Sequence, residues 1–216
     1  RQKKVVEIIP EEKIDPETEQ IVLAGGLLTS GFVDLQVNGG GGVLFNDNPS
    51  LENLKTICEA HAKLGSTSIM PTLISDSPEV NKQAISAITD ALDQQINGLV
   101  GLHLEGPNLA LARKGAHKED FLRPMKEFDC LELESLANKI PNLMLTIAPE
   151  AVSPEQITRL SNAGAIISLG HTDCTFNQAV EAVDAGAICA THLFNAMSPF
   201  GSREPGLVGA VLNSGK

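Results

Sequence analysis

The sequence predicts an α/β fold of the (β/α)8 barrel type, present only through its sixth strand. Six short β-rich segments alternate with helical patterns, and strands that are separated by helices pair in parallel. A doubly wound sheet satisfies this alternation too, but polar residues follow the C-terminal ends of several strands, where barrel enzymes carry their active sites. The six segments are residues 32–37, 66–73, 99–104, 143–147, 165–169 and 187–191.

Helical patterns fill the connections between these segments. The best marked begins at Ser153, because Pro154 suits the first helical position and Gln156 completes a capping box. The other patterns show apolar residues at helical spacing. Together they lie within residues 51–64, 80–92, 131–140, 153–164 and 173–186.

The first 30 residues are expected to belong to a different domain from the rest. Residues 1–30 contain β-prone stretches at 5–9 and 21–23, so we expect part of a small accessory β-sandwich. Residues 31–216 are expected to form the incomplete catalytic barrel. Since the chain lacks an initiating Met and six strands account for it, we expect a fragment whose last two strands lie beyond Lys216.

Composition limits the classes of partner. The formal net charge of −11 argues against nucleic acid or acidic membranes, because a polyanion would be repelled. With no Trp and no Tyr to stack on a sugar, a carbohydrate would be held by polar groups and a charged anchor. No apolar run approaches the roughly 20 residues that cross a membrane, and the four cysteines form no C-x-x-C pair. We therefore expect a soluble, cytoplasmic protein with a small-molecule ligand.

The candidates for metal binding are Glu105, His171 and His192. Each directly follows or ends a different predicted strand, so a barrel would bring the three side chains together at one end. Two imidazoles and one carboxylate leave a divalent ion an open position for water, as in catalytic zinc sites. The alternative is that each residue only anchors a loop by a hydrogen bond, and spacing alone leaves the two interpretations nearly even.

Other polar residues near the strand ends have two interpretations each. His103 shares a strand face with Glu105, one layer deeper, and could support the metal ligands or simply pack in the interior. His117 lies in a long loop above the same end, which favours a functional role. Arg203 could receive a phosphate, although spacing alone favours an ion pair with Glu204 or another loop carboxylate.

Six stretches carry a more specific signal. Thr-His-Leu-Phe-Asn-Ala-Met at 191–197 and Arg-Glu-Pro-Gly at 203–206 are the most distinctive. With the other stretches, they resemble the N-acetylglucosamine-6-phosphate deacetylase family of the amidohydrolase superfamily, from about residue 21 to the end. The matching stretches are residues 31–39, 103–107, 114–117, 170–172, 190–197 and 203–206.

The resemblance implies roles for individual residues. Glu105, His171 and His192 match the metal ligands of the family. Where the superfamily usually has His-x-His, this sequence has Gln36 and Asn38, so the resemblance implies one divalent ion, first of all Zn²⁺, with Fe²⁺, Co²⁺ or Mn²⁺ also acceptable. Gln36 is expected to position the metal water. The positions that match contacts to the sugar phosphate are Ala116, His117, Asn195, Ala196 and Arg203.

The implied reaction is hydrolysis of the acetamide of N-acetylglucosamine 6-phosphate to glucosamine 6-phosphate and acetate, by a homodimer. The general acid/base of the family is an Asp, expected beyond Lys216, so residues 1–216 alone are expected to be inactive. Two alternatives remain open. One is another amidohydrolase that acts on a cyclic amide or nucleobase, and the other is a non-catalytic barrel that binds a sugar phosphate.

Overall fold

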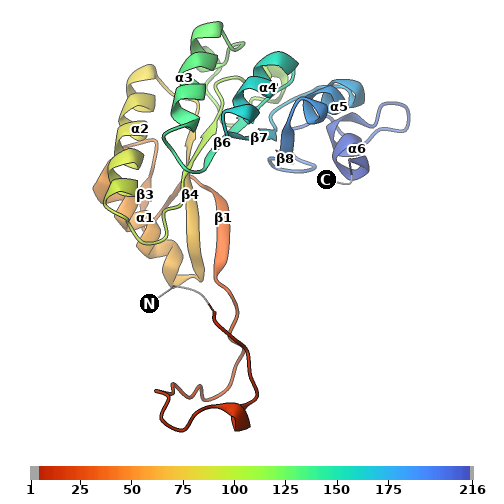
Figure 1. Ribbon diagram of the computed structural model, residues 1–216. Coiled ribbons are helices and arrows are strands. Elements are labelled where there is room, and N and C mark those ends of the chain that lie inside the picture. The colour runs from red at the N-terminus through yellow and green to blue at the C-terminus, as the bar shows by residue number, and fades with distance from the viewer. Residues whose placement is uncertain (1–4, 215–216) are drawn as a thin grey trace. The chain divides into compact units, whose positions relative to one another are not determined.

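The computed structural model describes residues 5–214, and the chain divides into two units, Arg1–Ser30 and Gly31–Lys216. In the second unit, six parallel strands form one sheet in the order β1-β4-β5-β6-β7-β8. Each strand is added beside the previous one, without the reversal of order that defines a doubly wound sheet. The result is a curled half-barrel (Figure 1). The strands are β1 Phe32–Val37, β4 Ser66–Ile74, β5 Leu102–Glu105, β6 Leu143–Ile147, β7 Ile166–Leu169 and β8 Ala187–Ala190.

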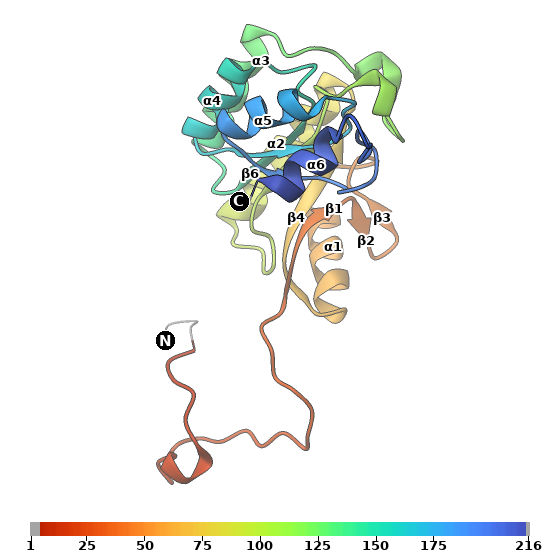
Figure 2. The same cartoon turned by 90° about the vertical axis from the view of Figure 1, so that its right-hand side faces the viewer.

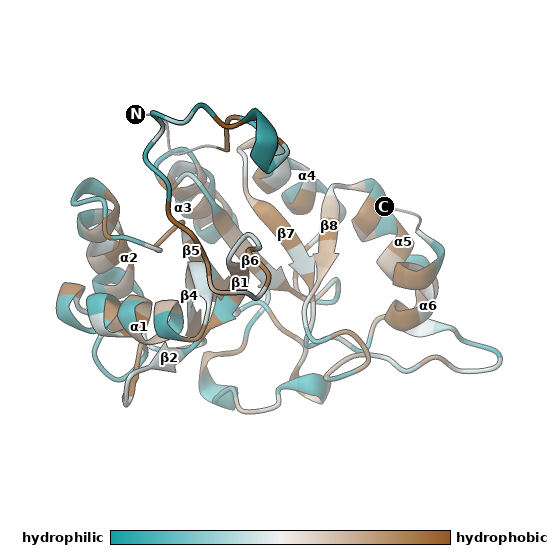
Figure 3. Cartoon of the chain, turned by 90° about the horizontal axis from the view of Figure 1, so that it is seen from below, coloured by the Kyte–Doolittle hydropathy of each residue, from teal (hydrophilic) through white to brown (hydrophobic). Residues whose placement is uncertain are grey.

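Helices follow the strands along one side of the curled sheet (Figure 3). The predicted capping box is confirmed, because the Ser153 side chain accepts from the backbone of Gln156 and the Gln156 side chain accepts from Ser153 N–H. No helix among residues 5–214 is long and apolar enough to cross a membrane. The helices are α1 Leu51–Lys63, α2 Pro78–Asp93, α3 Glu127–Ala137, α4 Pro154–Asn162, α5 Phe176–Asp184 and α6 Gly206–Asn213, with 3-10 turns at Glu11–Lys13, Leu111–Arg113 and Glu119–Phe121.

Two helices differ from the sequence prediction. Helix α3 begins at Glu127, earlier than expected, because Asp129 accepts a hydrogen bond from Lys126 N–H at 2.8 Å and caps an earlier turn. Helix α6 was not predicted, and it is mostly hydrophobic (Figure 3). A buried helix lacks the polar face on which amphipathic patterns depend.

A short hairpin follows β1. Strands β2 Gly39–Gly40 and β3 Val43–Leu44 pair antiparallel, and the turn between them uses positive φ at Gly41 (64°) and Gly42 (88°). Two successive residues with positive φ suit a tight hairpin turn, and glycine adopts them without steric cost. The hairpin lies beside α1, where His61 Nε2 is 3.0 Å from the Gly39 carbonyl oxygen (Figure 2).

The first unit does not confirm the expected accessory β-sandwich. Residues 5–30 contain one 3-10 turn and no strand. The β-prone side chains are exposed, with Val6 at 93% and Val22 at 86%. A strand requires a hydrogen-bonded neighbour, and residues 5–30 supply none to one another.

Strand β5 places its side chains alternately on the two faces of the sheet. Leu104 lies toward the helices and contacts the space between α2 and α3. His103 and Glu105 lie on the inner face, with His103 one layer deeper. The inner face at the C-terminal ends of the strands therefore carries the polar groups on which the candidate site depends.

Candidate functional site

Three side chains from three strand ends meet on the inner face of the sheet. Glu105 ends β5, while His171 and His192 follow β7 and β8. The Nε2 atoms of His171 and His192 lie 3.1 Å and 2.9 Å from the same Glu105 oxygen, Oε1. Possible ligand atoms of Glu105, His117 and His171 also lie within 4.8 Å of one another, so the cluster could hold a metal ion.

The backbone is strained at both histidines. His171 has φ 46° and His192 has φ 60°, in the left-handed region that side-chain-bearing residues rarely adopt. Such residues cost on the order of 1–3 kcal/mol and cluster at functional sites. Both carbonyl groups accept hydrogen bonds from loop residues: Ala110 N–H donates to His171 O at 2.9 Å, and Asn195 N–H donates to His192 O. At both positions the imidazole lies against Glu105.

The hydrogen-bond partner of Nδ1 determines what His171 can bind through Nε2. His171 Nδ1 lies 2.7 Å from the carbonyl oxygen of Arg113, which can only accept. Nδ1 therefore carries a proton, and in the neutral ring the Nε2 lone pair faces the Glu105 carboxylate. Two acceptors at 3.1 Å require a cation between them, either a proton or a metal ion. Burial would lower the pKa of His171, but hydrogen bonds to Glu105 and Arg113 raise it above its ordinary value.

His117 has the opposite arrangement. Its Nδ1 accepts from the backbone N–H of Ser75 at 3.3 Å and lies 2.9 Å from the Ser75 hydroxyl. In the neutral ring the proton is therefore on Nε2, which lies 3.8 Å from Glu105 Oε2. His117 thus presents a hydrogen-bond donor to the site. Sequence reasoning missed Ser75, although it follows β4 as directly as the other polar residues follow their strands.

Gln36 connects the first strand to this cluster. Its side-chain amide donates to Glu105 Oε2 at 3.1 Å, and the same nitrogen lies 3.4 Å from His192 Nε2. Asn38 lines the same pocket. The amide of Gln36 thus occupies the side of the cluster that faces β1, and both Glu105 oxygens have partners.

Burial and charge set the protonation of the cluster. Burial would raise the pKa of Glu105, but the hydrogen bond from His171 and the nearby charges of His171 and His117 lower it to about 2. Burial lowers the pKa of His117 to about 4, against the opposing charge of Glu105. Burial likewise lowers the pKa of His103 to about 4. At neutral pH the site therefore combines a carboxylate with neutral imidazoles at positions 103 and 117.

A pocket of about 380 Å³ opens over the cluster. Ala116 and His117 line it together with the possible ligands, and so do Gln36 and Asn38. Asn195, Ala196 and Arg203 are not among its lining residues. The predicted site residues up to His192 in the sequence therefore all line this pocket. The other three, Asn195, Ala196 and Arg203, lie in the loop after His192.

The loop that contains Arg203 leaves its guanidinium free among the described residues. Arg203 is exposed, and no ion pair involves it within residues 5–214. Glu204, the expected competitor, instead accepts hydrogen bonds from the backbone N–H groups of Phe176 at 2.7 Å and Gly206 at 3.0 Å. These bonds cap the first turns of α5 and α6, so Glu204 fixes the loop rather than neutralising Arg203.

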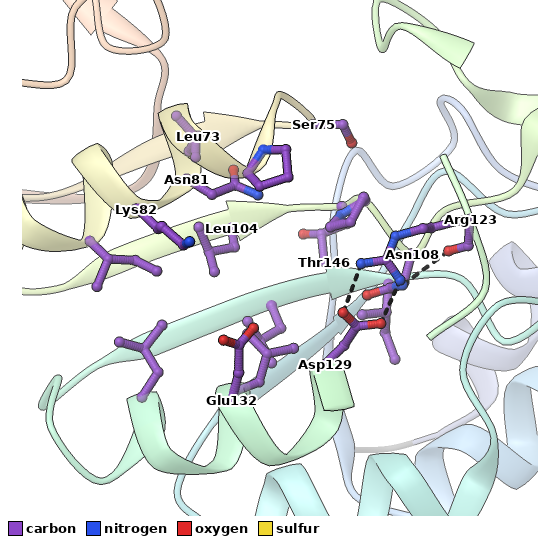
Figure 4. A pocket seen from close by; sticks show the side chains of 18 of the residues that line it. Leu73, Ser75, Asn81, Lys82, Leu104, Asn108, Arg123, Asp129, Glu132 and Thr146 are labelled. Atoms are coloured by element: carbon purple, nitrogen blue, oxygen red, sulfur yellow. Dashed lines mark hydrogen bonds and ion pairs between the residues drawn. The ribbon is translucent and has the colours of Figure 1, made fainter. Parts of the chain in front are cut away.

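A second cavity, of about 670 Å³, lies on the helical side of the sheet between α2 and α3 (Figure 4). Lys82 of α2, Leu104 of β5 and Glu132 of α3 line it. Its polar edge contains the ion pair of Arg123 with Asp129, at 2.5 and 2.7 Å. The cavity contains none of the possible metal ligands, so the smaller pocket is the candidate active site.

Comparisons with known proteins identify the family of this chain. Residues 27–213 match the model of the amidohydrolase family. A Shewanella sp. (strain ANA-3) relative named N-acetylgalactosamine-6-phosphate deacetylase is 45% identical over 89% of this chain and 48% of its own length. A Haemophilus influenzae relative named N-acetylglucosamine-6-phosphate deacetylase is 40% identical over 96% of this chain and 54% of its own.

Solved structures show the same similarity. The N-acetylglucosamine-6-phosphate deacetylase from Pasteurella multocida superposes with a TM-score of 0.88 at 40% identity, covering 94% of this chain and 54% of that one. A mutant of the Mycobacterium smegmatis enzyme, in complex with N-acetyl-D-glucosamine-6-phosphate, has a TM-score of 0.76 at 35% identity, covering 84% and 47%. The chain spans about half the length of these relatives. Because the family model matches most of the chain, this protein belongs to the amidohydrolase family.

Proposed function

We propose that this protein hydrolyses the acetamide of N-acetylglucosamine 6-phosphate to glucosamine 6-phosphate and acetate. One divalent metal ion is held by Glu105, His171 and His192. The observation that carries the proposal is the convergence of two imidazole Nε2 atoms on one oxygen of a buried carboxylate. The Haemophilus influenzae relative and the Pasteurella multocida structure, each 40% identical to this chain, carry this activity in their names.

The proposed ion, when bound, would activate water and polarise the amide carbonyl. We infer zinc first, although iron, cobalt and manganese accept the same ligands. Gln36 occupies a position where the superfamily usually has a histidine ligand for a second metal ion, and its amide is proposed to hold the attacking water. His117 Nε2–H is proposed to donate to the substrate. Ala116, Asn195, Ala196 and Arg203 are proposed as further contacts to the sugar phosphate.

The general acid/base is proposed to come from another residue. Glu105 is the sole carboxylate among the residues that line the pocket in the described part of the chain. One of its oxygens faces the two imidazoles and would bind the ion, and the other accepts from Gln36, so Glu105 is committed to these partners and is a poor carrier of protons between water and the leaving amine. The Asp that the family resemblance predicts beyond Lys216 would fill this role, and residues 1–216 alone are then inactive.

A second candidate substrate differs in the configuration of the sugar. The Shewanella relative, at 45% identity, is named for N-acetylgalactosamine 6-phosphate, which differs from the glucosamine compound in one hydroxyl configuration. The proposed metal centre and phosphate contact serve either epimer. The substrate class is thus an N-acetylhexosamine 6-phosphate, with the glucosamine form as the first expectation.

Release of acetate tests this function directly. We expect turnover of N-acetylglucosamine 6-phosphate by the full-length protein, and much slower but measurable turnover of unphosphorylated N-acetylglucosamine. The galactosamine epimer is assayed in parallel to decide the configuration. Faster hydrolysis of a cyclic amide would favour the other amidohydrolase class, while binding of the sugar phosphate without acetate release would indicate a non-catalytic protein.

Substitutions at two histidines test the assignment of ligands. His171→Gln is expected to weaken metal affinity by more than about 100-fold, the upper end of what partners outside the ligand shell cost. His117→Gln is expected to leave metal affinity nearly unchanged and to raise KM, because His117 donates to substrate. Metal affinity is measured by competition with a chelator. The reverse result, with metal lost only in His117→Gln, would replace His171 by His117 in the ligand set.

The wider assembly is also a proposal. We infer that residues 31–216 are part of a (β/α)8 barrel completed by two further strands, and that residues 1–30 belong to an accessory domain. By family resemblance we expect a cytoplasmic homodimer. Size-exclusion chromatography with light scattering on the full-length protein measures the oligomeric state.

A further inference from the structure

A chain of buried hydrogen bonds runs beneath the candidate metal centre. His103 Nε2 lies 2.7 Å from Thr146 Oγ1, which lies 2.7 Å from Thr191 Oγ1, which lies 2.7 Å from Ser168 Oγ. At the other end, His103 Nδ1 lies 3.0 Å from the Leu35 carbonyl oxygen. His103, Thr146 and Ser168 are fully buried, and Thr191 is 5% exposed. The five groups come from five different strands or strand ends.

The direction of every hydrogen bond in this chain is fixed. The Leu35 carbonyl can only accept, so the neutral His103 ring carries its proton on Nδ1 and accepts at Nε2. Thr146 must then donate to His103, which leaves its oxygen to accept from Thr191. Thr191 in turn accepts from Ser168. Each hydroxyl donates once toward Leu35, and no alternative pattern satisfies all four bonds.

Thr72 does not disturb this order. Its hydroxyl lies 3.3 Å from His103 Nδ1 but has nearer partners. It accepts from Val37 N–H at 3.0 Å and donates to the Met70 carbonyl at 3.2 Å. Thr72 is therefore satisfied without competing for the proton of His103.

Two members of the chain directly precede residues of the metal centre. Thr191 directly precedes His192, and Leu35 directly precedes Gln36. Strands β1 and β8 are the two edges of the sheet, so their separation is not fixed by direct pairing with each other. Yet Gln36 Nε2 and His192 Nε2 approach to 3.4 Å. The buried chain spans the interior between these edges at a depth just below the ligands.

We propose that His103 is a positioning residue that sets the geometry of the metal centre through this ordered chain of hydrogen bonds. The inference rests on the proposed function, because it concerns the same metal site. His103 does not touch the ligands' side chains. It holds the backbone carbonyl of Leu35 directly and the side chain of Thr191 through Thr146, and so the placement of Gln36 and His192, one residue further on.

Paired substitutions at Thr146 test the proposal in the full-length protein. Thr146→Val keeps the shape and removes the hydroxyl, whereas Thr146→Ser keeps the hydroxyl. We expect Thr146→Val to weaken Zn²⁺ affinity by about 10-fold, the lower end for residues outside the ligand shell, and Thr146→Ser to restore most of it. The control Ile157→Val lowers stability from a buried site on α4 and should leave Zn²⁺ affinity unchanged.

A measurement on the unmodified protein does not depend on the folding of variants. NMR of ¹⁵N-histidine-labelled protein is expected to show His103 as the Nδ1–H tautomer with a slowly exchanging ring proton. A proton on Nε2 would reverse the chain and overturn the proposal. So would a Thr146→Val protein that melts lower but binds Zn²⁺ as tightly as the wild type. If the wild type itself binds no divalent ion, the proposed metal centre fails, and this inference fails with it.

Discussion

Replacing Glu105 by Gln is expected to abolish metal binding and acetate release together. Glu105 is 2% exposed and provides the oxygen on which His171 and His192 both converge. A neutral amide supplies a poor ligand and also removes the negative charge that the ion requires. We expect metal affinity to fall by more than about 100-fold, beyond the range for residues outside the ligand shell. Equilibrium dialysis against Zn²⁺, followed by metal analysis, measures the loss.

The matched control is Glu132→Gln, on the opposite side of the sheet. Glu132 is exposed on α3 and lines the outer cavity (Figure 4). The substitution removes the same charge from the protein but leaves the inner face intact, so metal content and turnover should match the wild type. Retention of both metal and activity in Glu105→Gln would remove Glu105 from the ligand set.

Replacing Arg203 by Met is expected to remove most of the preference for a phosphorylated substrate. A hydrogen bond to a charged group contributes about 1.5–3 kcal/mol, which corresponds to roughly 10- to 100-fold in KM for the sugar phosphate. Unphosphorylated N-acetylglucosamine should be hydrolysed at an unchanged rate, because it makes no use of the guanidinium. Steady-state kinetics of the wild type and the variant with both substrates gives the preference as the ratio of the two kcat/KM values.

Arg159→Met is the control for loss of a cation. Arg159 is bonded to Glu127 and Glu134 at 2.8–3.0 Å, on the helical side of the sheet and away from the pocket. Its removal changes the net charge equally but should leave KM for both substrates as in the wild type. If Arg203→Met raised KM for both substrates alike, Arg203 would shape the loop and would not bind phosphate.

The alternation of strands and helices was predictable because it rests on local patterns. All six predicted segments correspond to strands of the parallel sheet. Helix α6 escaped prediction because it is mostly buried and lacks an amphipathic pattern, and because side chains of the preceding loop cap its start. The Ser198 hydroxyl accepts from Leu207 N–H at 2.7 Å, and Glu204 accepts from Gly206 N–H. The β-prone residues before residue 31 carry no information about a pairing partner, so propensity alone predicted strands that residues 5–30 do not form.

Spacing alone predicted the metal ligands only because these residues end or directly follow strands, whereas Gln36 and Ala116 were implied only by the family resemblance. Glu105, His171 and His192 were proposed from that position, and the structure places their side chains in contact. The family resemblance implied different roles for His171 and His117, but the position of the ring proton in each was beyond the sequence. It depends on whether Nδ1 meets the carbonyl of Arg113 or the N–H of Ser75, and loops set these contacts. The same holds for His103, whose two interpretations are separated by the partners of its two nitrogens.

The number of divalent ions bound per chain tests the central claim most directly. Full-length protein is stripped with a chelator, reloaded with Zn²⁺, and analysed for metal content and acetate release at each stage. The account predicts one ion per chain, loss of activity on removal and recovery on reloading, because Gln36 and Asn38 do not supply the ligands of a second ion. Two tightly bound ions per chain, or undiminished activity in the stripped protein, would contradict it.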